Sequence, residues 1–175
     1  DRLTEAQINS VITLYSSGQI ETALNTVQTL IQDYPNEALL HNISGVCYAS
    51  LGQLDNAVLC YKKALNIKPN YVEVLNNLGI TYHKLNQLEE AVKNYEQALV
   101  IKPDYAEAFN NLGITLKELG QLDKAVKNYE RALAIKPDYT TAFNNVSVAL
   151  KEIGQPDSAV KSYKRILDIL SLIHI

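Results

Sequence analysis

Residues 72–105 read VEVLNNLGITYHKLNQLEEAVKNYEQALVIKPDY, and residues 106–139 read AEAFNNLGITLKELGQLDKAVKNYERALAIKPDY. These adjacent stretches agree at 23 of 34 positions, which chance does not produce, so the chain contains a 34-residue repeat. Working outward at the same step gives five copies, which cover residues 4–37, 38–71, 72–105, 106–139 and 140–173. A unit of this length cannot cover its own apolar face, so the copies are expected to stack into a solenoid.

Each copy reads as two helices joined by a turn. The first helix is predicted to stop at Gly52, Gly120 or Gly154, where a left-handed residue is needed, and Asn86 is the next best residue for that backbone. Acidic residues, which suit the positive end of a helix dipole, open the second helix. They are Asp55, Glu89, Asp123 and Asp157. The sequence therefore predicts an all-α chain of ten helices.

The starts of the first helices carry a second signal. Asn70 and Asp104 directly follow prolines, and Glu73 and Glu107 lie three residues later. Asn and Asp are good N-cap residues, and a Glu at this spacing fits a capping box. We therefore expect helices to begin with Asn70 and Asp104 as their N-caps.

Helical periodicity assigns the faces of copy four. Phe109 and Leu112 fall on one side of the first helix at about 100° per residue, which makes that side the packing face. Gly113 lies on the same side, so Ala125 and Tyr129 of the second helix are expected to approach it closely.

The pattern of these residues resembles the tetratricopeptide repeat (TPR) family. Copy three supplies Leu75, Leu78, Gly79, Tyr82, Ala91, Tyr95, Ala98 and Pro103, and copy four supplies Phe109, Leu112, Gly113, Leu116, Ala125, Tyr129, Ala132 and Pro137. The resemblance implies one right-handed α-solenoid domain over residues 1–175, with atypical first and last copies. It also implies a concave groove lined by the first helices, which binds a peptide or a protein partner.

Asparagines lie on the expected groove side of the first helices. The sixth residue of copies three to five is Asn77, Asn111 or Asn145, and the fifth residue of copies two to five is Asn42, Asn76, Asn110 or Asn144. An amide offers donors and an acceptor to a peptide backbone. This row resembles the asparagine ladder of O-linked N-acetylglucosamine transferases. The alternative is that these side chains only cap or solvate the inner helix face.

Other side chains complete the candidate lining. Apolar residues stand between the amides, and lysines stand at one edge of the groove. They are Ile80, Ile114 and Val148, and Lys84, Lys117 and Lys151. A clamp for a C-terminal carboxylate is not expected, because the positions that would hold its cations carry none. In the two possible frames they are Ile8, Ile12, Ile43, Glu73 and Asn77, or Asn42, Val46, Asn77, Glu107 and Asn111.

Composition and motifs point away from catalysis. The three histidines are scattered, and no pair of His, Cys or carboxylate residues has a convincing metal spacing, so we expect no catalytic residue, metal or cofactor. His41 is expected in the core, and Cys47 and Cys60 are expected as free thiols. A net charge of −3 without a basic stripe predicts no nucleic-acid partner, and no apolar run is long enough for a membrane span.

The two ends leave alternatives open. The chain begins at Asp1 without a Met, and it ends in the apolar run of residues 169–175, so we expect a fragment of a longer protein. The primary hypothesis is a non-enzymatic interaction scaffold, with a cytoplasmic location suggested by its free thiols. The first alternative is a substrate-recruiting arm of a larger glycosyltransferase or sulfotransferase. The second is an oligomerisation module, a homodimer through the apolar C-terminal end.

Overall fold

The structure is a computed structural model that describes residues 2–154 and 156–173. Over these residues the chain is all-α, with ten helices and no strand. It divides into two compact units, residues 1–86 and residues 87–175. The unit boundary falls at Asn86, inside the third predicted copy, and a single domain over residues 1–175 stays a prediction.

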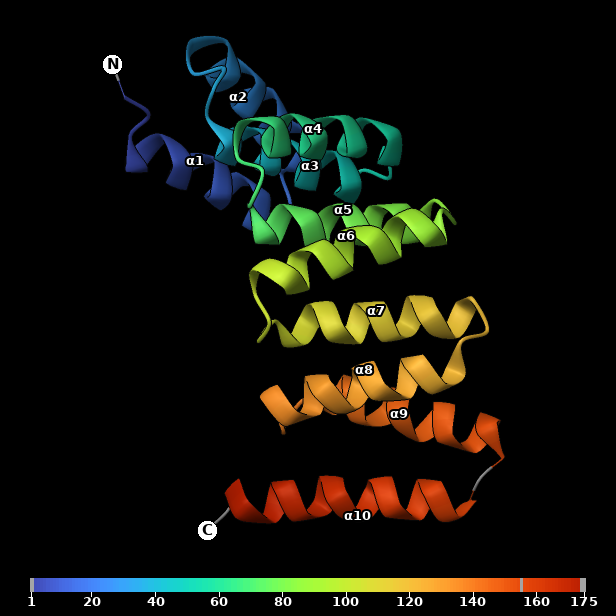
Figure 1. Ribbon diagram of the computed structural model, residues 1–175. Helices are drawn as coiled ribbons and strands as arrows, with labels where there is room; N and C mark the ends of the chain where they lie inside the picture. The colour runs from blue at the N-terminus through green and yellow to red at the C-terminus, as the bar shows by residue number, and fades with distance from the viewer. Residues whose placement is uncertain (1, 155, 174–175) are drawn as a thin grey trace. The chain divides into compact units, whose positions relative to one another are not determined.

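The first unit contains five helices. They are α1 (Glu5–Ser16), α2 (Ile20–Asp33), α3 (Ala38–Ser50), α4 (Leu54–Ile67) and α5 (Val72–Lys84) (Figure 1). Each helix packs on the next, and α3 also contacts α5. Val11, Val27 and Leu40 are fully buried between these helices, so the core forms where successive helices meet.

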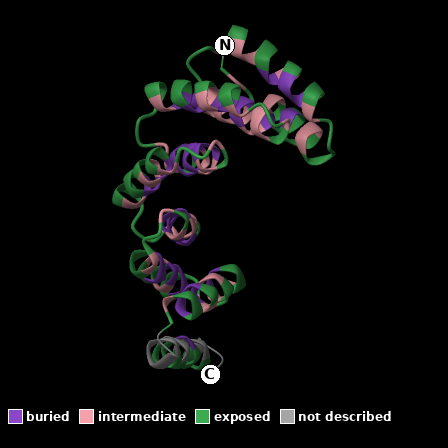
Figure 2. Ribbon diagram, turned by 90° about the vertical axis from the view of Figure 1, so that its right-hand side faces the viewer, coloured by how far each residue is buried: buried purple, intermediate pink, exposed green. Residues whose placement is uncertain are grey.

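The second unit contains the other five helices. They are α6 (Leu88–Ile101), α7 (Ala106–Glu118), α8 (Leu122–Ile135), α9 (Thr140–Ile153) and α10 (Pro156–Ile173). α7 packs against α6, α8 and α9, and α10 packs against α9. Figure 2 shows the buried residues on the sides of the helices that face their neighbours. Residues 174 and 175 of the apolar C-terminal run, and the side chains of residues 169, 170 and 173, lie outside the described part of the chain.

The predicted stops of the first helices are confirmed. Gly52, Gly120 and Gly154 have φ values of 74°, 78° and 67°, and Asn86 has a φ of 58°. Asn86 is the only non-glycine residue with positive φ among the residues that the structure describes. Most side chains would be strained in this left-handed conformation, which is why glycine or Asn stands where the first helix ends.

The predicted N-caps are wrong. The N-cap residues of α5 and α7 are Tyr71 and Tyr105, and neither makes a side-chain cap hydrogen bond. Asn70 lies in a turn closed by the Tyr71 N–H, which donates to the Lys68 carbonyl at 3.2 Å. The Pro-Asn and Pro-Asp pairs therefore occupy the two central positions of β-turns, which is another favoured place for these residues. The structure has a capping box at Thr4 and Gln7 instead.

Close approach of paired helices is also confirmed. A Cβ atom placed on Gly113 would lie 2.5 Å from Cε1 and 2.7 Å from Cδ1 of Tyr129, and a Cβ on Gly45 would lie at the same distances from Tyr61. Contacts this short do not occur between real atoms, so only glycine fits. The aromatic ring of the second helix thereby sets how closely the pair packs.

Candidate functional site

Asparagines link consecutive repeats of the first unit. The Asn77 side-chain amide on α5 donates to Oδ1 of Asn42 on α3, at 3.2 Å. Burial raises the pKa of Tyr71, and a hydrogen bond from the Asn42 side chain partly offsets that rise. Asn42 therefore accepts the Asn77 bond through its oxygen, which leaves its nitrogen to face other partners.

The second unit repeats this arrangement. Asn145 on α9 donates to Oδ1 of Asn110 on α7 at 3.0 Å, and Asn110 hydrogen-bonds the phenol of Tyr139. Both asparagine bonds join residues 35 positions apart, which is one more than the repeat length. A fifth-position amide is thus a structural partner for the sixth-position amide of the following repeat.

The predicted contact residues differ in exposure. Asn76 is 6% exposed and Asn110 is 2% exposed, and their burial argues against the peptide contact predicted for them. Asn42, Asn77, Asn111, Asn145, Ile80 and Ile114 are half-buried, and Asn144, Val148, Lys84 and Lys151 are exposed. The predicted contact residues that stay accessible in the second unit are Asn111, Ile114 and Lys117 on α7 and Asn144, Asn145, Val148 and Lys151 on α9. We call this surface the asparagine face of the second unit.

Charges on this face are partly neutralised. Lys117, which is half-buried, forms an ion pair with Glu152 of α9 at 3.1 Å. Glu107, at the start of α7, lies 4.0 Å from the Lys136 ammonium. Exposed ion pairs of this kind contribute little stability, and they leave a face of mixed sign. The arrangement suits recognition by amides and apolar side chains better than recognition of one strong charge.

The candidate reactive side chains are deactivated. His41 is buried, and its Nε2 lies 2.8 Å from the Pro35 carbonyl oxygen, as expected for a core residue. Cys47 is buried, and burial raises the pKa of its thiol. Burial also raises the pKa of the half-buried Cys60. A hydrogen bond with Ser44 and the charge of Lys63 lower this pKa, but by less than burial raises it. Both thiols are free, as predicted, and a raised pKa makes a thiol a poorer nucleophile at neutral pH.

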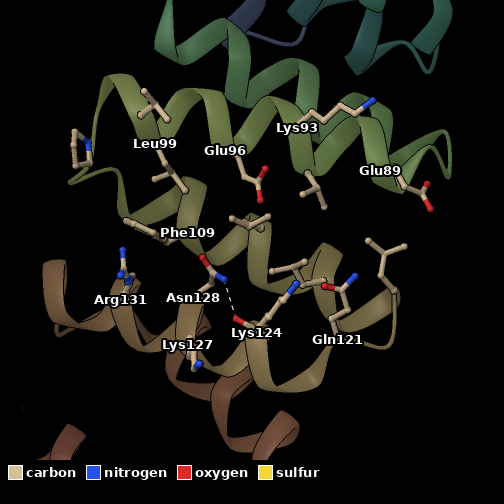
Figure 3. Close-up of a pocket in the computed structure, with 16 residues that line it drawn as sticks. Glu89, Lys93, Glu96, Leu99, Phe109, Gln121, Lys124, Lys127, Asn128 and Arg131 are labelled. Carbon is tan, nitrogen blue, oxygen red and sulfur yellow. Dashed lines mark hydrogen bonds between the residues drawn. The ribbon is translucent and has the colours of Figure 1, made fainter.

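A groove that the sequence did not predict lies between α6 and α8, with a volume of about 910 Å³ (Figure 3). Apolar side chains of α7 form its floor, and they belong to the packing face of that helix, not to its asparagine face. The floor residues are Phe109, Leu112, Leu116 and Leu119. None of the sequence-predicted contact residues lines it. We call this feature the α6–α8 groove.

The walls of the α6–α8 groove are polar and differ in net sign. α6 contributes Glu89, Lys93 and Glu96, and α8 contributes Lys124, Lys127 and Arg131. Arg131 also lies over the Phe109 ring, at 5.8 Å from its centroid. A helical wheel shows which side of a helix a residue takes and not what stands opposite, so the sequence alone does not bring these charges together.

Comparison with known protein families identifies the repeat. Models described as TPR repeat match residues 45–86 and 81–120, and a model described as tetratricopeptide repeat matches residues 106–139. The chain belongs to the tetratricopeptide repeat family. The TPR matches fall on the copies that are closest to the repeat pattern, and they leave the first copy and the last copy uncovered. Among curated protein sequences, none matches the chain significantly.

Solved TPR structures share the fold. A structure of MamA is 22% identical, covers 99% of both chains and has a TM-score of 0.82. YrrB, described as a TPR protein with an unusual peptide-binding site, is 23% identical over 93% of this chain and 84% of its own, with a TM-score of 0.73. The first TPR of Spaghetti (RPAP3), bound to the HSP90 peptide SRMEEVD, is 25% identical over 67% of this chain and 94% of its own, with a TM-score of 0.66.

The described residues also bear on metal binding and on membrane insertion. No group of three or more His, Cys, Asp or Glu side chains is arranged to hold a metal ion in the part of the chain that the structure describes. Over the same residues, no helix combines the length and the apolar character that crossing a bilayer requires.

Proposed function

We propose that this chain is a non-catalytic protein-interaction scaffold whose asparagine face binds an extended segment of a partner protein. The TPR assignment supports the general role, because solved relatives of this fold include one bound to a peptide and one described by its peptide-binding site. The proposal is made for each unit separately, with Asn77 in the first unit and Asn111 and Asn145 in the second.

One observation carries the proposal. The hydrogen bond from Asn145 to Asn110 holds the Asn145 amide in one orientation at a half-buried position. This bond uses one N–H of the Asn145 amide. Among the described residues, none accepts a bond from its second N–H, and none donates a bond to its Oδ1. A pre-oriented amide that still offers a donor and an acceptor matches one peptide unit of an extended chain at little entropic cost.

The apolar side chains favour an interior segment of the partner. Val148 is 46% exposed beside Asn145, and Ile114 is half-buried on the neighbouring helix. The HSP90 peptide in the RPAP3 structure ends in acidic residues, but this chain lacks cations at the positions where a carboxylate clamp would need them. We therefore propose a segment recognised mainly through its backbone, with small apolar side chains toward Val148 and Ile114.

Peptide display tests this proposal. Peptides selected from a random library against residues 1–175 should bind the Asn111→Ala/Asn145→Ala variant at least about tenfold more weakly, because two backbone contacts are lost. The matched control is Asn56→Ala/Asn66→Ala on α4, which removes two exposed amides elsewhere. Methylating the peptide backbone nitrogens should weaken binding more than replacing peptide side chains. Equal affinity for the variant and its control would contradict the asparagine face as the binding site.

A further inference from the structure

The α6–α8 groove has two charged walls that differ in net sign. α6 contributes Glu89, Lys93 and Glu96, of which Lys93 is ion-paired with Glu90, and α8 contributes Lys124, Lys127 and Arg131. Glu89 and Glu96 are seven residues apart on α6, and Lys124 and Arg131 are seven residues apart on α8. In Figure 3 the Glu89 and Glu96 carboxylates project from α6 toward the cavity, and the Lys124 and Arg131 side chains rise toward it from α8. Seven residues are two helical turns, so each pair marks one edge of its helix.

Among the described residues none of these four charges forms an ion pair, although Glu89 lies close enough to Lys93 to interact with it electrostatically. The ion pairs there involve other side chains, and on α6 and α8 they join Lys93 to Glu90, and Arg165 to Glu130. On α8, Gln121 and Asn128 alternate with the cations, so this wall carries no acidic group among the groove residues. Charges arranged this way beside an apolar floor offer complementarity to a partner that brings both signs.

The floor is spaced for a helix. Leu112, Leu116 and Leu119 lie at i, i+4 and i+7 on α7. Leu112 and Leu116 are buried, so the apolar surface open to a partner comes from the half-buried Leu119 and Leu99 and from Val100. Val100 is 82% exposed, the highest value among the large exposed hydrophobic residues. Grooves that receive a helix present contacts at i, i+3 or i+4, and i+7.

We propose that the α6–α8 groove docks an amphipathic helix of a partner protein. The apolar stripe of that helix would lie along the groove, against Leu119, Leu99 and Val100. Its acidic flank would face Lys124 and Arg131, and its basic flank would face Glu89 and Glu96. The groove is separate from the asparagine face, so this site is independent of the peptide site proposed above.

Designed peptides test the site by its charge pattern. The probe is a fluorescein-labelled helix of about 16 residues with leucines at i, i+3 and i+7, glutamates on one flank and lysines on the other. Two comparison peptides carry glutamates on both flanks or lysines on both flanks. Fluorescence anisotropy against residues 1–175 should show the mixed probe binding at least about tenfold more tightly than either comparison peptide, with the difference shrinking as salt is added.

Charge reversal gives the sharper result. Lys124→Glu/Arg131→Glu makes both walls acidic, so the variant should prefer the peptide with lysines on both flanks. Glu89→Lys/Glu96→Lys should prefer the peptide with glutamates on both flanks. The matched control, Lys63→Glu/Lys164→Glu, changes net charge equally at exposed positions outside the groove and should keep the preference of the parent. Circular dichroism checks that each variant is folded, and Val100→Asp gives a further variant at an exposed position.

Several outcomes would overturn the proposal. One is that the mixed probe binds no better than the comparison peptides. Another is that the charge-reversed variants keep the peptide preference of the parent. A third is that the control variant changes this preference as much as the charge-reversed variants do. If light scattering shows a dimer of the parent that the probe dissociates, the groove holds a second copy and not a partner helix. Loss of probe binding in Asn111→Ala/Asn145→Ala would place the probe on the asparagine face instead.

Discussion

The α3–α4 pair and the α7–α8 pair are built to the same spacing from different residues. In both, a glycine of the first helix lies against a tyrosine ring of the second, and the distances from a hypothetical Cβ are the same. The surrounding core differs, because α3 buries His41, Ser44 and Cys47 where α7 buries Phe109, Leu112 and Thr115. Ser44 and Cys47 are 2% and 0% exposed, so the smaller polar side chains are as well enclosed as the larger apolar ones.

This difference separates two roles within the repeat. The glycine–tyrosine contact determines how closely two helices approach, and a side chain at the glycine would have to displace the tyrosine ring. The neighbouring core positions accept His or Phe, Ser or Leu, and Cys or Thr, because they fill a space whose size is already set. Positions outside the packing faces are then available for binding, as with Asn111 in the second pair and Ile43 at the same place in the first.

The largest expected effect comes from filling the shared contact. Gly113→Leu and Gly45→Leu should each lower the free energy of unfolding by about 3 kcal/mol, because the added side chain overlaps Tyr129 or Tyr61. Urea titration of the two variants measures this loss. Similar losses would show that the two pairs are equivalent, and a loss at one glycine alone would show that the other pair can adjust.

The asparagine links should distinguish the two pairs. Asn110→Ala removes a fully buried acceptor from Asn145, so we expect a loss of about 2 kcal/mol. Asn42→Ala removes the half-buried counterpart, whose partner Asn77 can turn to water, so we expect about 1 kcal/mol. Thermal unfolding of both variants, with Asn66→Ala as the exposed control, measures the difference. Equal losses would mean that burial does not set the strength of these links.

A smaller effect is expected at high pH. Burial, and then the charges of Glu118 and Glu152, raise the pKa of Tyr129 to about 12, compared with an ordinary value of about 10. Between these values the unfolded chain loses the phenol proton before the folded chain does. Stability is therefore complete below pH 10 and falls as pH rises, by about 1 kcal/mol at pH 11 from this residue.

Tyr129→Phe provides the matched comparison for that titration. The variant should lose less stability than the parent between pH 9 and about pH 11, since it has no phenol to ionise at this position. Tyr61→Phe in the first pair should behave in the same way, because burial also raises the pKa of Tyr61. If the parent and the variants lose the same stability as pH rises, ionisation of these two tyrosines is not the cause of the loss.

The smallest effect concerns a surface contact of the second pair that the first lacks. Lys117→Gln removes the ion pair with Glu152, and Ala49 stands at the corresponding place in α3. We expect a loss of about 0.5 kcal/mol at low ionic strength, which disappears in high salt because the pair is exposed. A loss that salt does not reduce would assign the packing of the lysine stem, and not its charge, as the cause.

The fold was predictable from the sequence because its determinants are local. A glycine or Asn86 at the end of each first helix and a tyrosine opposite a glycine recur at the same step, and both are confirmed. The N-cap prediction at Asn70 and Asp104 failed because the Pro-Asn and Pro-Asp pairs fit a turn as well as a cap. The backbone N–H of the residue after each pair donates to the carbonyl of the residue before it, and this bond shows that the pair forms a turn and not a cap.

The candidate sites were predictable to different degrees. The side of the helix that carries Asn111 and Asn145 follows from periodicity, but the bond that buries Asn110 needs the spacing between stacked helices. The α6–α8 groove depends even more on that spacing, since Glu96 and Lys124 become neighbours of one cavity only after three helices have packed. A repeat pattern predicts which residues form each helix. It does not predict the distance between two helices, such as α6 and α8, that both pack on the same third helix.

The 35-residue reach of the asparagine bonds has a consequence for how the chain is made. A ribosome adds about 5–20 residues per second, so the partner of Asn42 follows within seconds, and the same holds for Asn110. No stabilising contact of this kind waits for a distant part of the polypeptide. Each repeat can thus be secured to its predecessor while synthesis continues, and such short-range topology is typical of chains that fold rapidly and expose little unfolded surface to other nascent proteins.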